Sequence, residues 1–232
     1  MTGRKVWTSG AHPRNRGLAT IRTDPAAPKH KGVTAVVVDL TAPGVTVRPL
    51  RQITGDSDFN EVFLDDVFVP DEDVVGVPGG GWDVARATLG NERVSIGGGS
   101  GTRRDRASAL DLLGLLDTYA PGDAGLTREV GRLVAEQESV RLLNARAVER
   151  ALIGAAPSAE GNVTKLLVAE QMQAVAELAV RILGPAAVAD AVPAVVQDYL
   201  GSRAMTIAGG TSEVTRNVIA ERILGLPREA VK

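Results

Sequence analysis

The stretch "IAGGTSEVTRN", residues 207–217, combines a backbone turn with the start of a helix. Gly209 and Gly210 have no Cβ, so they permit positive φ angles and a close approach by a ligand. The Thr-Ser pair that follows provides a helix cap, and Glu213 falls in the first helical turn. A helix N-terminus behind such a bare turn favours ligand binding. Because Glu213 would repel a phosphate, a hydroxyl- or amine-bearing group is the expected guest.

The composition excludes several classes of function. The 232 residues carry a formal net charge of -2, which gives no electrostatic footprint for nucleic acid. There is no cysteine, so thiolate metal sites and cysteine nucleophiles are excluded. The two histidines, His12 and His30, are predicted to be surface loop residues, and no metal site is predicted. The absence of an apolar leader or a membrane-length apolar run favours a cytoplasmic protein without a membrane span.

The chain changes character near residue 75. Before it, β-branched runs alternate with turn signals, which predicts strands at 32–40, 44–50 and 59–70. After it, the apolar period becomes helical, which predicts helices at roughly 80–118, 127–154, 160–184, 191–206 and 211–225. The chain is therefore predicted to be α+β and mainly α, with a partial antiparallel β-domain over 1–76 and a helical bundle over 77–232. The opening "KVWTSG" is typical of the middle of a strand, so we expect further sheet upstream of it.

One carboxylate falls on an apolar helix face. Ala85, Leu89, Glu92 and Ile96 are spaced by four, three and four residues, so they share one face of the predicted helix. A carboxylate there is costly unless it is paired or functional, and burial would raise its pKa toward the range of a general base. The alternative is that the helix breaks at the following glycines and Glu92 pairs with Arg93 or another surface cation. The residues alone leave both interpretations open.

Other glycine-rich and acidic segments give weaker signals. The clusters at 78–82 and 97–101 fit neither the P-loop pattern nor a dinucleotide-binding fingerprint. The acidic residues between 56 and 73 lack the spacing of a calcium loop, and they are predicted to be turn and cap residues. The segment "VWTSG" at 6–10 places an aromatic ring beside two hydroxyls at the end of a strand.

Taken together, these segments resemble the acyl-CoA dehydrogenase family. The resemblance follows the family's order nearly from end to end of the chain, and it covers only the family's C-terminal part. The segments that carry it are "KVWTSGAH", "APGVTVRPL", "FNEVFLDDVFVP", "GGGW", "NERVSIGGG" and "SRAMTIAGGTSEVTRNVIAERILGLPRE". The implied fold is the end of the middle β-domain followed by the C-terminal four-helix bundle.

The resemblance implies a redox activity in lipid metabolism of the β-oxidation type. The family oxidises an acyl-CoA thioester to its trans-2-enoyl-CoA with FAD, and an electron-transfer flavoprotein usually reoxidises the flavin. In many members the catalytic glutamate directly precedes the Gly-Thr of the C-terminal turn, where this chain has Gly209. A smaller group carries the glutamate on the first bundle helix, and the matching position here is Glu92. The resemblance thus implies that the double-glycine turn binds a ligand and that Glu92 is the catalytic base.

The same resemblance implies contacts with the cofactor and the substrate. The expected FAD-binding residues are Trp7, Ser9, Gly184, Gly209, Gly210, Thr211 and Glu213. Trp7 and Ser9 match a strand that contacts the isoalloxazine, and Gly184 matches a turn that reaches the FAD of a neighbouring subunit. The Gly209 N–H matches the donor that polarises the thioester carbonyl. Arg93 matches an arginine near the CoA pantetheine.

Three interpretations remain open at this point. The chain is either a catalytic acyl-CoA dehydrogenase part, a non-catalytic partner subunit that packs against a complete homologue, or an inert fragment. Acyl-CoA oxidases share the same chemistry. Every version favours a homo- or hetero-oligomer with acyl-CoA dehydrogenase-type subunits. The sequence does not indicate the length or branching of the acyl chain.

Overall fold

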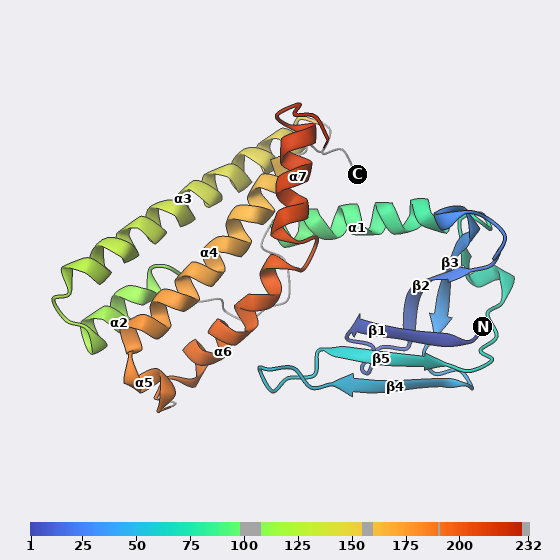
Figure 1. Cartoon of the computed structure of the whole chain (residues 1–232), viewed down its shortest axis with the longest axis horizontal. Coiled ribbons are helices and arrows are strands. Elements are labelled where there is room, and N and C mark those ends of the chain that lie inside the picture. Colours follow the sequence, from blue (N-terminus) through green and yellow to red (C-terminus); the bar gives the residue numbers. More distant parts are fainter. Residues whose placement is uncertain (98–107, 155–159, 190, 229–232) are drawn as a thin grey trace. The chain divides into compact units, whose positions relative to one another are not determined.

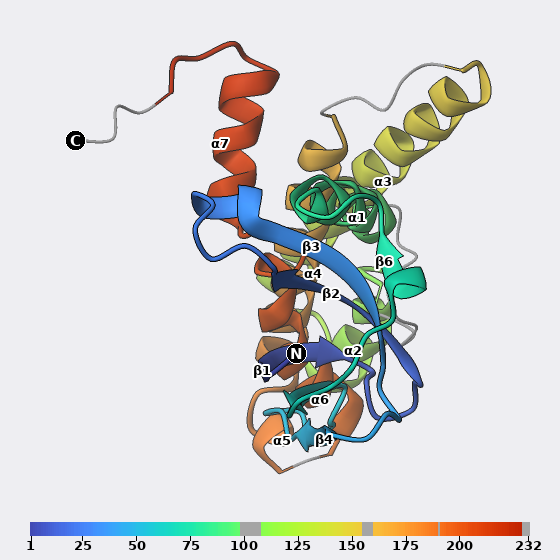
Figure 2. The same ribbon diagram turned by 90° about the vertical axis from the view of Figure 1, so that its right-hand side faces the viewer.

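The structure, a computed structural model, describes residues 1–97, 108–154, 160–189 and 191–228. Within them the chain forms two compact units, Met1–Gly90 and Asn91–Lys232. All six strands lie in the first unit, and the second unit is helical in the residues that the structure describes (Figures 1 and 2). The predicted α+β class with a mainly helical chain is confirmed. The unit boundary falls inside a helix, whereas the sequence predicts a division at 76/77, and that domain assignment stays a prediction.

The first unit contains two three-stranded antiparallel sheets. One has the order β1-β5-β4, built from Gly3–Ser9, Phe59–Leu64 and Val45–Leu50. The other has the order β2-β3-β6, built from Arg16–Arg22, Val33–Asp39 and Val74–Val75. Two 3-10 turns, η1 (Lys29–Gly32) and η2 (Asp71–Asp73), precede β3 and β6.

The core of this unit takes residues from both sheets. Val36 and Val38 of β3 are buried with Val62 and Leu64 of β5, as the alternation of each strand requires. The strand predicted for 59–70 ends at Leu64, because the chain turns at Asp65–Asp66 and Asp66 has a φ of +49°. The sequence analysis missed β2, whose seven residues pair along the whole of β3.

The second unit is a helical bundle around α4. Its helices are α2 (Asp111–Tyr119), α3 (Ala124–Leu152), α4 (Glu160–Leu183), α5 (Pro185–Val188), α6 (Pro193–Ser202) and α7 (Ser212–Arg222), with the 3-10 turn η3 (Arg203–Thr206) after α6. Helix α1 (Gly81–Gly97) begins in the first unit. Figure 1 shows α4 running through the bundle, where it packs against α2, α3, α6 and α7.

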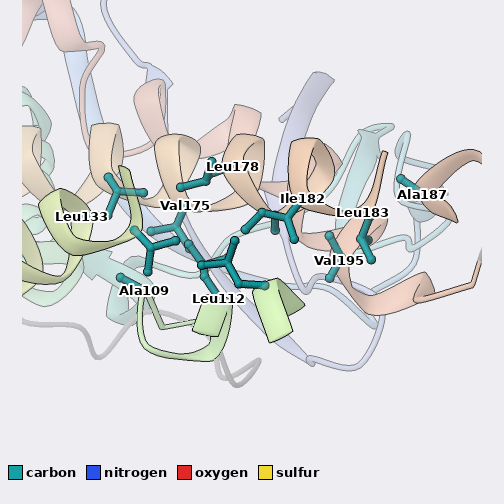
Figure 3. Packing of buried hydrophobic residues seen from close by; sticks show 12 residues of the cluster. Ala109, Leu112, Leu133, Val175, Leu178, Ile182, Leu183, Ala187 and Val195 are labelled. Carbon is teal, nitrogen blue, oxygen red and sulfur yellow. The ribbon is translucent and has the colours of Figure 1, made fainter. Parts of the chain in front are cut away.

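The core of the bundle lies against the second half of α4. Val175, Leu178 and Ile182 are each at most 4% exposed, and they gather with Leu112 of α2 and Leu133 of α3 (Figure 3). In the first half of α4 the buried face includes polar residues, and an apolar side chain is exposed. Leu167 is 38% exposed, whereas Lys165 is only 1% exposed.

The helix predicted over 80–118 contains two helices within the described residues. Residues 98–107 lie outside the description, and α2 begins only at Asp111. The Ser108 N–H donates to Asp111 Oδ2 at 2.6 Å, and the Leu110 N–H donates to Ser108 Oγ at 3.2 Å. Gln137 of α3 accepts the Ala109 N–H at 2.8 Å. These side chains satisfy backbone donors at a helix start, which is why α2 begins where it does.

Candidate functional site

Trp7 and Ser9 lie on β1 at a β-bulge. Lys5 pairs with Val62 and Thr8 with Asn60, so β1 has one more residue than β5 between these two pairs. Trp7 takes up the bulge with a φ of +61°, which is uncommon for a side chain of its size. Its indole is 64% exposed and meets the Phe59 ring edge-on at 6.0 Å between centroids. The bulge therefore presents an aromatic face outward, beside the exposed Ser9.

Asn60 holds the end of β1 in place, and sequence reasoning missed it. Its side chain is fully buried, it donates from Nδ2 to the Thr8 carbonyl at 3.0 Å, and its Oδ1 lies 3.1 Å from His12 Nδ1. An asparagine at an inward position of "FNEVFL" is a signal that could have revealed it, because a buried amide needs partners. His12 is exposed on a loop, as predicted.

Helix α1 carries Glu92 and Arg93, whose side chains lie outside the described residues. Of the predicted apolar face, Ala85 is half-buried and Leu89 is 50% exposed. The described part of that face is therefore not buried within the chain, and it gives no burial argument for the pKa of Glu92.

The start of α1 is fixed to the first unit. The Gly79 N–H donates to Thr34 Oγ1 at 3.0 Å, and Trp82 stacks on His30 at 5.3 Å between ring centroids. At Gly81 a Cβ would come within 2.5 Å of the Ala35 nitrogen, so the helix meets β3 through bare backbone. The "GGGW" segment thus sets where the helix that carries Glu92 begins.

The double-glycine turn precedes α7 as predicted. Gly209 and Gly210 have φ angles of +67° and +109°. Thr211 is the N-cap of α7, and its Oγ1 accepts the Val214 N–H at 3.2 Å. Glu213 lies in the first turn of the helix. The pKa of Glu213 is lowered by its own backbone N–H and next by the Thr211 side chain, with further help from the charges of Arg216 and Lys165.

Two buried polar groups lie beneath this turn. Lys165 of α4 donates from Nζ to the Gly210 carbonyl at 2.5 Å, so the turn receives an amine from its own chain. Ser212 is 5% exposed, and its Oγ has no hydrogen-bond partner among the described residues. A buried hydroxyl without a partner costs free energy, which makes it a candidate ligand contact. Sequence reasoning missed Lys165, because a lysine within a helical period reads as a surface residue, and it considered Ser212 only as part of the Thr-Ser cap.

Gly184 is at the other end of α4. It has a φ of +54° and caps α5, with Pro185 as the first helical residue. At about 1.5 Å per residue, the helix from Lys165 to Gly184 is roughly 28 Å long, so α4 separates Gly184 from the double-glycine turn. Gly184 and the double-glycine turn therefore do not form one contiguous feature.

The structure therefore distributes the predicted site residues over two units. Trp7 and Ser9 lie in the first unit, and the residues from Glu92 onward lie in the second. Among the predicted site residues that the structure describes in the second unit, only those within Gly209–Glu213 lie together in one segment. No group of three potential metal-ligating side chains occurs in the described parts of the chain. The helices described are all too short or too polar to cross a bilayer.

Comparisons with known proteins place these features in one family. The family model for the C-terminal domain of acyl-CoA dehydrogenases matches residues 79–224. Acyl-CoA dehydrogenase FadE34 of Mycobacterium tuberculosis is 45% identical over 98% of this chain and 31% of its own length.

Two solved structures are similar over nearly the whole chain. The Tcur3481-Tcur3483 steroid ACAD has a TM-score of 0.85 and 28% identity, with 98% of this chain and 61% of that chain covered. The ChsE4-ChsE5 complex of Mycobacterium tuberculosis has a TM-score of 0.79 and 27% identity, with the same coverage of 98% and 61%. The chain thus spans less than two thirds of the length of each of these proteins.

Proposed function

Because the chain belongs to the acyl-CoA dehydrogenase family, we propose that it supplies the C-terminal part of an FAD-dependent acyl-CoA dehydrogenase. The proposed reaction converts an acyl-CoA thioester to its trans-2-enoyl-CoA. The observation that carries the proposal is that the family match over 79–224 contains both Glu92 and the double-glycine turn. The turn has the glycine conformations and the threonine cap of a binding turn.

The described residues fit the proposed cofactor in two ways. The exposed indole of Trp7 offers a flat apolar face beside the Ser9 hydroxyl. The Ser212 hydroxyl, buried without a partner in the described residues, lies beside the turn, where a polar ligand group would satisfy it. We propose that the residues holding FAD are Trp7, Ser9, Gly184, Gly209, Gly210, Thr211 and Glu213. When bound, FAD supplies the two-electron oxidant that the desaturation requires.

The chain's own groups act on the thioester. Glu92 is proposed to remove the α-proton as general base. The Gly209 N–H is proposed to donate a hydrogen bond to the thioester carbonyl, which stabilises the negative charge that develops there as the proton leaves. Arg93 is proposed to bind the pantetheine arm of CoA. An electron-transfer flavoprotein is the proposed acceptor.

A second candidate function is that of a partner subunit. The names of two similar structures, the Tcur3481-Tcur3483 steroid ACAD and the ChsE4-ChsE5 complex, each join two different polypeptides. This favours association of the present chain with another acyl-CoA dehydrogenase-type subunit. In that version Glu92 would be dispensable. The word steroid in one name makes a steroid-derived acyl-CoA a substrate to test beside straight-chain thioesters.

The first test is flavin retention and its reduction. The chain is purified alone and with a co-expressed acyl-CoA dehydrogenase-type subunit, incubated with FAD and desalted. We expect visible flavin absorption that acyl-CoA bleaches.

Glu92→Gln should keep the flavin and slow bleaching by about 100-fold or more, the usual contribution of a general base. Glu136→Gln, on the exposed side of α3, is the control that should leave bleaching unchanged. Unaltered bleaching in Glu92→Gln would move the base elsewhere and favour the partner-subunit function.

A further inference from the structure

Lys165 is the largest side chain that the described part of the chain buries completely. It is 1% exposed, and its ammonium lies 2.5 Å from the Gly210 carbonyl oxygen. Taking an ammonium out of water is costly unless hydrogen bonds and opposite charges compensate for it. An apolar side chain would fill the same space without the free-energy cost of burying a charge. The lysine is therefore explained by its hydrogen bond to the turn rather than by packing alone.

The turn needs an external constraint because of its two glycines. Without a Cβ, Gly209 and Gly210 reach many backbone conformations, and the peptide between residues 210 and 211 is free to rotate. In a trans peptide the C=O and the N–H point in opposite directions. When Lys165 holds the Gly210 carbonyl, the Thr211 N–H is therefore directed away from Lys165. One buried ammonium thus determines where a backbone donor at the start of α7 points.

Other polar residues of α4 hold the segments on either side of the turn. Gln173 donates to the Ser202 carbonyl at 3.3 Å and to Thr206 Oγ1 at 3.1 Å. Glu170 pairs with Arg216 of α7, and Glu177 pairs with Arg203 of η3 at 2.8 Å. These contacts attach the flanking elements to α4, whereas Lys165 reaches the turn itself.

We propose that Lys165 is a positioning residue that fixes the peptide between Gly210 and Thr211, and with it the backbone donors that precede α7. It touches neither substrate nor reacting atoms in this role. The consequence for FAD affinity rests on the proposed function, but the effect on the turn does not.

The test compares Lys165→Met with Gln173→Met. Both changes replace an α4 side chain that donates to a backbone carbonyl, and both leave an unbranched apolar stem. The measurement is residue-resolved hydrogen exchange of the ligand-free chain. The informative amides are those of Gly210, Val214 and Thr215, which donate to Ile207 O, Thr211 Oγ1 and Thr211 O.

Lys165→Met should raise exchange at these three amides by about tenfold or more, while core amides of α3 and α4 stay protected. Gln173→Met should leave these three amides within about twofold of the parent. Unchanged exchange in Lys165→Met, or an equal rise throughout the bundle, would overturn the proposal. If Lys165→Met does not fold, Lys165→Gln carries the same test. The glutamine keeps a hydrogen-bond donor but is shorter than lysine. Exchange at the turn should therefore rise, and by less than in Lys165→Met.

A second readout connects the turn to the proposed cofactor. Where the parent chain binds FAD, Lys165→Met should raise the dissociation constant by about tenfold, and Gln173→Met by less than about twofold. Equal losses of affinity in both variants would assign Lys165 a role in stability only. If the parent binds no FAD but the exchange result holds, the proposed cofactor function fails while the positioning role of Lys165 stands.

Discussion

At the residue scale, the ionised side chain of Glu213 interacts with the turn that precedes α7. Its carboxylate is held at the start of α7 by its own N–H and by Thr211, and its pKa is lowered from the ordinary value of 4.5. A carboxyl group with a lowered pKa in the folded state stabilises the protein at pH values above its unfolded pKa. That contribution is lost as the pH falls through the lowered value.

Replacing Glu213 should therefore change the stability of the bundle in a pH-dependent way. We expect Glu213→Gln to be less stable than the parent at neutral pH, and the difference should shrink as the pH falls below 4.5. Denaturant midpoints followed by far-ultraviolet circular dichroism across this range provide the measurement. Glu136→Gln serves as the control on a distant helix. A difference that persists at low pH would mean that the Glu213 side chain acts through packing rather than through its charge.

At the scale of elements, the start of α1 depends on a position without a side chain. A Cβ on Gly81 would lie 2.5 Å from both the Ala35 nitrogen and the Thr34 carbonyl carbon, which are backbone atoms of a paired strand. Neither can move without disturbing β3, so the helix must shift instead. Such overpacking usually costs about 1–3 kcal/mol.

We expect Gly81→Ala to destabilise the first unit by about that amount and to alter the fluorescence of Trp82, the next residue. Equilibrium unfolding followed by tryptophan fluorescence measures both effects. The matched control is Gly114→Ala in α2, where a Cβ would meet nothing within 4 Å. That change should stabilise its helix by about 0.5–1 kcal/mol, measured by circular dichroism, and should leave the tryptophan fluorescence unaltered. If Gly81→Ala leaves stability and fluorescence unaltered, the start of α1 is not held against β3.

At the scale of the whole molecule, the two units have separate hydrophobic cores. One core lies between the two sheets and the other around α4. Both tryptophans, Trp7 and Trp82, belong to the first unit, so tryptophan fluorescence reports on that unit alone. The circular dichroism of helices reports mainly on the second unit.

A core substitution should therefore affect one signal more than the other. Leu112 is fully buried in the helical core, so Leu112→Ala should destabilise that unit by about 2–5 kcal/mol. The denaturant midpoint by circular dichroism should fall, while the midpoint by fluorescence should stay near that of the parent. Val62→Ala, in the other core, should give the reverse pattern. Equal shifts of both midpoints in either variant would show that the units unfold as one.

Several features followed from the sequence because they depend on local chemistry. Glycine pairs, a threonine cap and the change from period two to a helical period are read within a few residues, and they predicted the turn, α7 and the mainly helical class. The family resemblance also rests on such short segments, and the match over 79–224 confirms it.

The tertiary structure decided what depends on distant partners. β2 gains its stability by pairing with all of β3, and the bulge at Trp7 exists only relative to β5. The burial of Asn60 and Lys165 follows from partners 52 and 45 residues away along the chain, Thr8 and Gly210. A periodic pattern cannot show such burial, because a polar side chain moves inside only where the folded chain supplies its hydrogen bonds. The sequence therefore determined the family and the double-glycine turn before α7, and the packing of α4 against that turn determined which buried side chain contacts it.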